Sequence, residues 1–310
     1  MLKKNFNITE NTKILICCHK KCELPQDEIF LPIQVGAAIS NEDLGIQRDD
    51  RVNGEVCDNI SSKNKNYCEL TAVYWAWKNI KKLYPDLEYI GLNHYRRYFS
   101  FDKKNFSDDS IIKSTSLVAN YKIDKKKLSK LLQKGYTIVA KPRVYQYSLS
   151  VDYACCHVSD DLRLLQKIIH ELTPEYDEAF FSAIICNNKL SPYNMTVIGL
   201  RNFDDYCDWL FKILFEAEKR INISNYNPVQ ARIFGYMAER LFNVWLYKNS
   251  KKVKKINIYK YDDSSKQNVL RQYICKIRNS ILFFGTQPFR KTISEKYLNS
   301  LKNDWEMKGF

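Results

Sequence analysis

The sequence predicts an α/β fold in which parallel strands form a sheet flanked by helices. Two observations lead to this prediction. Short apolar segments of strand length occur at residues 13–20, 89–99 and 136–142. The segments at 67–84 and 126–135, which lie between them, carry apolar residues at helical spacing instead. A chain that alternates strand and helix in this way pairs its strands in parallel and covers the sheet with helices.

The composition indicates a folded chain with an anionic partner. Of the 310 residues, 45% are hydrophobic and 14% are aromatic, which is enough for a sizeable core. The formal net charge of +14 points to nucleic acid, a phosphate-bearing small molecule or an anionic membrane. No secretory signal is recognised, and no apolar run approaches the roughly 20 residues of a membrane span. We therefore expect a cytoplasmic protein with reduced thiols.

The first strand is followed by a long polar stretch at 44–70 that is rich in Asp, Asn and Ser. A loop of this length in a compact domain is commonly a binding loop. Its acceptors and amide donors suit sugar hydroxyls and the ribose of a nucleotide, although the same composition fits a solvated surface loop. A carboxylate at the start of the next helix either stabilises the helix dipole or binds a hydroxyl. The candidate binding residues are Asp49, Asp50, Asp58, Asn59 and Glu69.

The sequence YIGLNHYRRYF at 89–99 predicts a second strand that ends in charge. Gly91 in this strand permits close packing. Open α/β sheets bind ligands beyond the carboxyl ends of their strands, so the end of this segment is expected at a ligand crevice. If the strand continues, Arg96 and Arg97 point to opposite sides of it.

The charged end of this segment suits phosphate. A guanidinium from Arg96 or Arg97 can bind phosphate oxygens in a bidentate manner. His94 is a candidate phosphate donor, metal ligand or base. The alternative is structural, with one arginine paired to a core carboxylate and His94 as an interior histidine.

The second half of the chain is mainly helical. Apolar residues at helical spacing predict helices at 160–172, 202–221 and 227–247, and a strand is predicted at 192–200. Residues 100–120 are polar and indicate an exposed insertion.

Several well-known site motifs are missing. No HExxH, no CxxC pair and no Asp-x-Asp at a strand end occurs, and neither does a P-loop, GxGxxG or GxSxG. The sequence thus lacks the fingerprint of a kinase-type phosphate cradle, a dinucleotide-binding fold or a serine hydrolase. A metal site is poorly supported, and its ligands are unknown.

Seven segments, taken in order, are similar to the successive blocks of one bacterial family. They are LPIQVGAAIS, LGIQRDD, DNISSKNKNYCELTAVYWAWKN, YIGLNHYRRYF, SPYNMTVI, YCDWLFKILFEAEKRI and ARIFGYMAERLFNVWL. The family is a domain long described only as of unknown function, which occurs in gene clusters for capsular polysaccharide, exopolysaccharide and O-antigen. The resemblance covers about residues 13–248. Its tryptophan-bearing helix and HYRRYF blocks are specific, because random α/β proteins do not reproduce both in order.

The resemblance implies a glycosyltransferase with a GT-A-like, Rossmann-related mixed sheet. Members of the family are regarded as glycosyltransferases, and some are assigned as galactofuranosyltransferases. We therefore expect a transferase domain at 13–248 that moves a hexose, with galactofuranose among the candidates, from a nucleotide-diphosphate sugar such as a UDP-sugar. The expected acceptor is a growing surface polysaccharide, either a free glycan or a lipid-linked one.

The resemblance also implies how the leaving group is stabilised. Arg96 or Arg97, helped by His94, would neutralise the diphosphate, because charge builds on it as the glycosidic bond breaks. Most GT-A enzymes use an Asp-x-Asp motif with a divalent ion at this place. The strand here ends in Asn-His-Tyr-Arg-Arg, so no cofactor is certain. A Mn²⁺ or Mg²⁺ ion held by His94 and a loop carboxylate is the lesser option.

Roles follow for the other candidates. Residues of the polar loop would contact the nucleotide: Asp49, Asp50, Asp58 and Asn59. Glu69 would reach the donor sugar, and Tyr193 and Asn194 would shape the acceptor side. An inverting transferase needs a carboxylate base for the acceptor hydroxyl, and Glu239 is the candidate unless it makes only an intrahelical contact. Asp160 and Asp161 are rival bases, and retaining chemistry stays open.

The segment 249–310 is predicted to be a basic helical tail outside the resemblance. Its start, NSKKVKKINIYKY, holds five lysines, and residues 267–284 are amphipathic and basic. Such a segment either rests on an anionic membrane or packs on the domain with a solvated outer face. The first alternative makes the protein peripheral at the inner face of the cytoplasmic membrane.

Two other function classes are consistent with the charge. A phosphotransferase that decorates polysaccharide would share the anionic donor but transfer phosphorus. A basic nucleic-acid-binding protein would use the lysines and tyrosines. However, the lysines concentrate in the tail and no named nucleic-acid motif occurs, so no nucleic-acid partner is expected.

Overall fold

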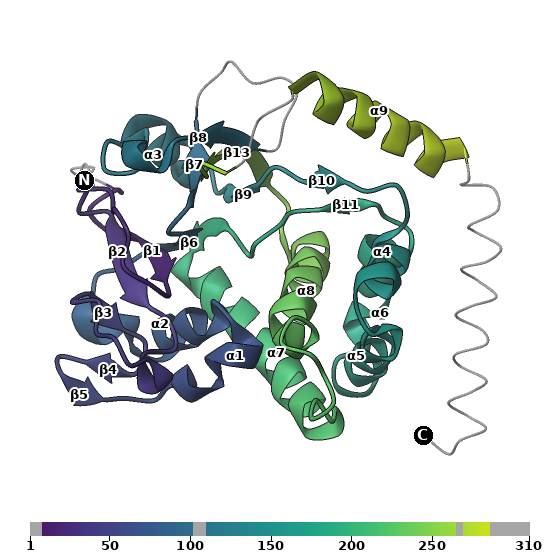
Figure 1. Cartoon of the computed structure of the whole chain (residues 1–310), viewed down its shortest axis with the longest axis horizontal. Helices are drawn as coiled ribbons and strands as arrows, with labels where there is room; N and C mark the ends of the chain where they lie inside the picture. Colours follow the sequence, from purple (N-terminus) through teal and green to yellow (C-terminus); the bar gives the residue numbers. More distant parts are fainter. Residues whose placement is uncertain (1–7, 102–109, 265–268, 286–310) are drawn as a thin grey trace, which may run out of the picture.

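Figure 1 shows the computed structural model of the chain, which describes residues 8–101, 110–264 and 269–285. A mixed nine-stranded sheet forms its centre, in the order β12-β9-β13-β7-β6-β1-β2-β3, with β8 paired to β13. Most strands of this sheet lie on the left side of Figure 1, and helices α4 to α8 lie toward its right and lower right. This arrangement confirms the α/β class with a mixed sheet flanked by helices.

The N-terminal part of the sheet is parallel, as predicted. β1 (Thr12–Cys18) lies between β2 (Phe30–Gln34) and β6 (Tyr89–His94) and pairs in parallel with both. α2 (Leu70–Leu83) precedes β6 and packs on one face of the sheet. Alternate residues of β1 enter two different core clusters, because successive side chains of a strand point to opposite faces.

The segment YIGLNHYRRYF is a hairpin, which corrects the prediction of a single strand. β6 ends at His94, and β7 (Arg97–Ser100) runs back antiparallel with Arg97 opposite His94. Tyr95 and Arg96 form the turn. The sequence gives no signal for this turn, because neither Tyr95 nor Arg96 is a Gly, Asn or Asp, the residues that favour two-residue hairpin loops. Arg97 therefore lies opposite His94 in the hairpin, whereas Arg96 lies in the turn.

Gly91 allows close packing between β6 and β12 (Thr196–Gly199), which pair antiparallel. A Cβ atom at Gly91 would lie 2.9 Å from the carbonyl oxygen of Thr196 and 3.0 Å from Cγ2 of Val197. It would also lie 3.1 Å from Cγ1 of Ile14. The close packing predicted at this glycine is therefore confirmed.

The basic segment after residue 249 begins with a strand of the sheet, which corrects the predicted helical tail over this part, whereas the helical prediction is confirmed at 269–285. β13 (Val253–Tyr261) pairs in parallel with β9 (Thr137–Ala140) and antiparallel with β7. Its two isoleucines are buried, whereas Lys254 and Lys255 are exposed. The cluster of lysines conceals the short alternating pattern of the strand. The sheet thus extends past the boundary expected at residue 248.

Long helices enclose the larger core cluster. α5 (Ser159–Leu172), α7 (Leu200–Arg220) and α8 (Ile233–Asn249) contribute to it together with α2. α5 and α7 match their predicted ranges closely. α8 begins later than predicted because η6 (Gln230–Arg232) precedes it. α3 (Lys125–Gln133) packs against the second cluster on the other face of the sheet.

Short strands and the remaining helices complete the described part of the chain. The short strands are β3 (Gln47–Arg48), β4 (Arg51–Val52), β5 (Glu55–Val56), β8 (Ser110–Lys113), β10 (Arg143–Val144) and β11 (Lys189–Leu190). The remaining helices are η1 (Ala37–Ile39), η2 (Ser61–Lys63), α1 (Asn64–Tyr67), η3 (Thr115–Leu117), α4 (Leu149–Cys156), η4 (Pro174–Tyr176), α6 (Asp177–Phe180), η5 (Phe181–Ile185) and α9 (Val269–Gly285).

The polar segment 100–120, expected as an exposed insertion, contributes β8 to the sheet through its pairing with β13. Residues 102–109 of that segment lie outside the described residues, as does the part of the predicted tail beyond residue 285. Within the described ranges, no helix combines the length and apolar character needed to cross a membrane.

Candidate functional site

A cavity of about 810 Å³ lies at the edge of the sheet where β1 and β6 end. The register places Cys17 of β1 beside His94 of β6 at this edge, where the sequence predicts a ligand crevice. Side chains reach this strand-end cavity from β1, the β6–β7 hairpin, the start of α2 and the segment before α8. Its titratable and charged lining residues include His19, Lys65, Glu69, His94, Arg97 and Arg232.

The strand-end cavity carries an excess of positive charge. Lys65, Arg97 and Arg232 line it, and within the described ranges Glu69 is the one carboxylate that does so. Burial lowers the pKa of His19 below its usual range, so that imidazole is neutral at physiological pH. Three cations against one carboxylate suit a ligand with more than one negative charge, such as a diphosphate.

Arg97 is held in place without using all of its hydrogen-bond donors. Its Cζ lies 4.2 Å from the centre of the Tyr193 ring. Arg143 contacts the same ring at 4.8 Å and donates to the Tyr193 hydroxyl. Among the described residues, the buried Nε of Arg97 has no hydrogen-bond partner. A stacked arginine with an unsatisfied donor is preorganised for an acceptor such as a phosphate oxygen.

Tyr193 and Asn194 form a left-handed turn, with φ values of 69° and 54°. Such φ values strain residues other than glycine and need support from their surroundings. Glu239 Oε1 accepts from the backbone N–H of Tyr193 at 2.7 Å, and Glu69 Oε1 accepts from Nδ2 of Asn194 at 2.9 Å. His94 Nε2 donates to the Tyr193 carbonyl at 2.8 Å. The turn thus brings together five of the residues singled out in the sequence.

The two carboxylates at this turn differ in their surroundings. Burial raises the pKa of Glu69, outweighing its hydrogen bonds and the nearby guanidiniums. Burial likewise raises the pKa of Glu239, outweighing the charge of Arg240. Glu69 lines the strand-end cavity, whereas Glu239 is not among its lining residues and binds the turn. A carboxylate with a raised pKa is a stronger base than an exposed one, and only Glu69 of the two faces the cavity.

His94 is neutral at physiological pH. Its Nε2 must carry the proton, because the carbonyl oxygen of Tyr193 can only accept. Burial, followed by the charge of Arg97, lowers the pKa of His94 to about 4. The imidazole therefore adds no positive charge to the cavity, so the help expected from it in neutralising a diphosphate cannot come from a charged His94.

Asp49, expected at the nucleotide, instead organises the loop after β2. Its carboxylate is fully buried and accepts from the backbone N–H groups of Gly36 and Ala37, at 2.8 and 3.0 Å. It also accepts from the Ser61 hydroxyl. This carboxylate therefore has three donors within the protein and does not line the strand-end cavity.

The other three polar-loop candidates also have partners within the loop and α2. Asp50 accepts two hydrogen bonds from Arg48, which lower its pKa. Asp58 accepts from the Tyr74 hydroxyl at 3.0 Å. Asn59 donates to one backbone carbonyl and accepts from one backbone N–H of its own segment. None of the three is a lining residue of the strand-end cavity.

Arg96, Asp160 and Asp161 also lie off this cavity. The guanidinium of Arg96 lies 5.1 Å from the centre of the Tyr95 ring in the hairpin turn. Asp161 accepts from the hydroxyl of Tyr226 at 2.8 Å, and Asp160 is exposed on α5. The structure thus separates Arg96 from Arg97, and both aspartates from Glu69.

Arg232 and Lys65 line the cavity although sequence reasoning did not select them. Arg232 is the N-cap residue of α8, and its Nε donates to Sγ of Cys68 at 3.2 Å. A cation at a helix N-terminus opposes the helix dipole, and this unfavourable placement is a signal that could have identified it. Lys65 lies in the short helix α1 and gives no comparable signal.

The described residues do not bring together the ligands that the sequence suggested for a divalent cation, namely His94 and a loop carboxylate. Within the described ranges, no three His, Cys, Asp or Glu side chains gather so that they could hold a metal ion. His94 uses Nε2 to bind the Tyr193 carbonyl. The loop carboxylates of Asp49 and Asp50 are bonded elsewhere. Positive charge at the cavity comes from the side chains themselves.

Comparisons with known proteins cover most of the chain. A family model described as "Domain of unknown function (DUF4422)" matches residues 13–251. The apo structure of the bifunctional glycosyltransferase WbbM is similar to this chain, with a TM-score of 0.69 and 28% sequence identity. That match covers 81% of this chain and 45% of the WbbM chain, so this chain spans about half the length of that protein. No curated protein matches the sequence significantly.

Proposed function

The chain belongs to the DUF4422 family, and we propose that it is a glycosyltransferase that uses a nucleotide-diphosphate sugar as donor. The observation that carries this proposal is the strand-end cavity, where three cations and one carboxylate meet at the carboxyl ends of β1 and β6. The similarity to the WbbM structure supports glycosyl transfer in general.

The diphosphate of the donor would lie against Arg97 and Arg232. Negative charge grows on the leaving diphosphate as the bond to the sugar breaks, and fixed donors aimed at that charge lower the barrier. Arg97 is suited to this task because its position is set by Tyr193 while its Nε keeps a free donor among the described residues. Lys65 adds a third positive charge at the same cavity.

Glu69 would act as the base. Its carboxylate takes the proton of the acceptor hydroxyl, and the acceptor oxygen forms a bond to the anomeric carbon. The bond from that carbon to the diphosphate oxygen breaks, and its electron pair leaves with the nucleoside diphosphate. This sequence inverts the anomeric centre. The raised pKa of Glu69 supports the assignment, since it makes the carboxylate a better proton acceptor.

We extend the proposal to the substrates on the strength of the family resemblance. The sugar is a hexose carried by a UDP-sugar, with galactofuranose as the first candidate. The acceptor is a lipid-linked surface polysaccharide, and the strained turn at Tyr193 and Asn194 would shape its side of the site.

A donor screen tests the proposal. The full chain is incubated with UDP-hexoses and other nucleotide sugars, with and without Mn²⁺, and the products are separated. We expect slow hydrolysis to a nucleoside diphosphate and free hexose, at similar rates in both conditions. The Glu69→Gln variant should lose turnover, whereas the exposed control Asp160→Asn should keep it. Release of a nucleoside monophosphate with a sugar phosphate would instead identify a phosphotransferase and overturn the proposal.

A further inference from the structure

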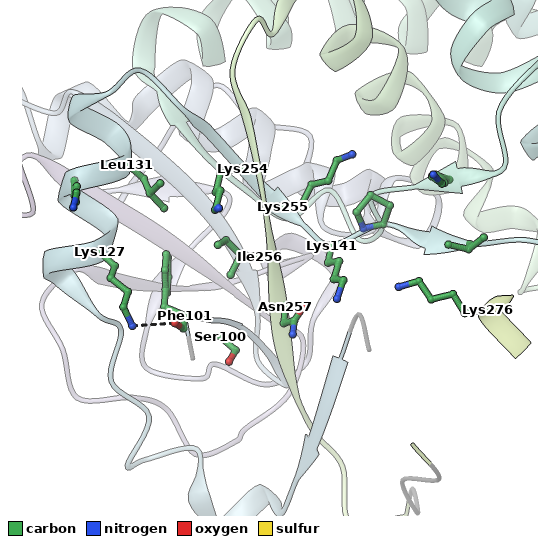
Figure 2. Close-up of a pocket in the computed structure, with 14 residues that line it drawn as sticks. Ser100, Phe101, Lys127, Leu131, Lys141, Lys254, Lys255, Ile256, Asn257 and Lys276 are labelled. Atoms are coloured by element: carbon green, nitrogen blue, oxygen red, sulfur yellow. Dashed lines mark hydrogen bonds between the residues drawn. The ribbon is translucent and has the colours of Figure 1, made fainter. Parts of the chain in front are cut away.

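A second cavity, of about 620 Å³, shares no lining residue with the strand-end cavity. Its wall is formed by α3, β10, β11, β13 and α9, together with the end of β7 and the segments that follow β7 and β9. Figure 2 shows Lys127 on the side of α3, and Lys276 extending from α9 toward Lys141. Seven lysines line this lysine cavity: Lys127, Lys130, Lys141, Lys189, Lys254, Lys255 and Lys276.

The charge of the lysine cavity is poorly balanced. Among the residues that the structure describes, no Asp or Glu lines it. Lys127 is partly compensated, since its Nζ lies 3.0 Å from an oxygen of Asp124 and also donates to the Phe101 carbonyl. So many ammonium groups around one hollow repel one another, and an anion that enters it relieves this repulsion.

The cavity also has an apolar wall. Phe101, Leu131, Pro142 and Ile256 line it together with the lysines, and Figure 2 shows Phe101, Leu131 and Ile256 among the lysine side chains. A wall of this kind suits an amphiphile, whose charged group binds the ammonium groups while its apolar part contacts the hydrocarbon surface.

α9 borders the lysine cavity with one side and exposes apolar residues on another. On its inner side Lys276 lines the cavity, Asn279 donates to the Val144 carbonyl at 2.9 Å, and Phe283 is buried. The outer side exposes large apolar residues at helical spacing, with Ile281 64% and Phe284 58% exposed. They form one stripe: Tyr273, Ile274, Ile277, Ile281 and Phe284.

We propose that the lysine cavity and the outer face of α9 form one docking surface for a bilayer of anionic phospholipid. The lysines bind the lipid phosphate groups, and the apolar stripe enters the interface beside them. Nucleic acid or a soluble phosphate would use the lysines but leave the adjoining stripe exposed to water. This inference concerns a surface separate from the strand-end cavity and does not depend on the chemistry proposed there.

Vesicle flotation of the full chain tests the charged part of the surface. The wild type should float with vesicles that contain anionic phospholipid and remain behind with neutral phosphatidylcholine vesicles. The variant Lys130→Gln, Lys254→Gln, Lys276→Gln should bind on the order of a hundredfold more weakly, since each lysine near an anionic surface contributes about fivefold. The control Lys126→Gln, Lys212→Gln, Lys219→Gln loses the same charge outside the cavity and should bind nearly as the wild type does.

A second pair of variants tests the apolar part. Ile277→Ser with Ile281→Ser should weaken vesicle binding at least tenfold, because burial of each apolar side chain in the interface contributes several-fold to affinity. Val56→Ser with Val229→Ser removes two exposed apolar side chains elsewhere and should change nothing. All of these residues are exposed, and circular dichroism checks that each variant folds.

Three outcomes would overturn the proposal. One is that the wild-type protein does not float with vesicles that contain anionic phospholipid. A second is equal weakening by the lysine variant and its charge-matched control, which would reduce the effect to net charge. The third is that calorimetry detects binding of inorganic phosphate or of an oligonucleotide, that the lysine variant loses this binding, and that the Ile277→Ser, Ile281→Ser variant retains it. Donor hydrolysis, measured in the same samples, should be unchanged in every variant, so failure here is separable from failure of the catalytic proposal.

Discussion

The backbone N–H of Tyr193 donates to Oε1 of Glu239 at 2.7 Å, which ties a strained turn to helix α8. The next residue, Asn194, makes the matching contact with Glu69 at the start of α2. Two buried carboxylates therefore hold one turn, but only Glu69 also faces the strand-end cavity. This difference separates a residue that positions the turn from one that can reach a substrate.

Glu239→Gln keeps an oxygen that can accept from Tyr193, so turnover should stay within about tenfold of the wild type. Glu239→Ala removes the acceptor and should lower the free energy of unfolding by about 1–3 kcal/mol, because a backbone donor loses its partner. Steady-state kinetics and urea denaturation measure the two effects. If Glu239→Gln were inactive while Glu69→Gln kept turnover, the base would be Glu239.

Arg97 and Arg96 are adjacent in sequence and form a matched pair of variants. Arg97 lines the strand-end cavity and Arg96 lies in the hairpin turn. We expect Arg97→Ala to reduce kcat/KM by on the order of 10²–10³, the loss typical of a donor that stabilises developing charge. Arg96→Ala should change it by less than about threefold. Equal losses would show that the hairpin as a whole, and not one guanidinium, matters.

His94 should make the folded protein less stable in acid. Its pKa in the fold, about 4, lies below the ordinary value of 6.5, so only the unfolded chain takes up a proton in this window. Stability is therefore lost as the pH falls from 6.5 toward 4, by up to roughly 3 kcal/mol. His94→Gln should flatten this part of the profile in denaturant titrations at a series of pH values. A profile identical to that of the wild type would contradict the neutral, buried imidazole.

Asp49→Ala tests whether this residue is structural. Loss of a buried carboxylate that accepts three hydrogen bonds should lower the free energy of unfolding by about 3–5 kcal/mol. At a temperature where the variant is folded, its KM for the donor should match that of the wild type. A large rise in KM with an unchanged free energy of unfolding would instead indicate that Asp49 binds the donor.

Gly91→Ala should destabilise the sheet. The new methyl group meets the Thr196 carbonyl at 2.9 Å, and a backbone atom of a paired strand cannot move aside cheaply. We expect a loss of about 1–3 kcal/mol, the usual cost of overpacking, visible as a lower melting temperature. Gly54→Ala is a control without a steric clash, because a Cβ at Gly54 would meet no atom within 4 Å. The φ of 84° at this residue adds backbone strain of its own.

Much of the fold can be predicted from local sequence patterns. The helix at 67–84, the strand that starts at Tyr89 and the close approach at Gly91 all follow from spacing and residue type, and the structure confirms them. The hairpin after His94 and the strand at 253–261 do not. Tyr95-Arg96 has no turn residue, and the lysines around Ile256 and Ile258 outweigh a short alternation.

The site shows the same division. His94, Arg97 and Glu69 could be selected because polar groups after a strand and before a helix point to a ligand edge. Asp49 meets the same criterion in the sequence. In the structure, however, its carboxylate accepts hydrogen bonds from the backbone N–H groups of Gly36 and Ala37, which only the folded loop brings near. Arg232 reaches the cavity from a distant helix start, and such long-range placement has no local signature apart from its opposition to the helix dipole.

The insertion of β13 between β7 and β9 affects the order in which the chain can assemble. A polypeptide that ended at residue 251 would present two open strand edges that face each other across a gap, and such edges attract strands from other molecules. On the ribosome the sheet cannot close until residue 261 has emerged, and pairing across so long a separation is slow. Expression of shortened versions should therefore keep this last strand.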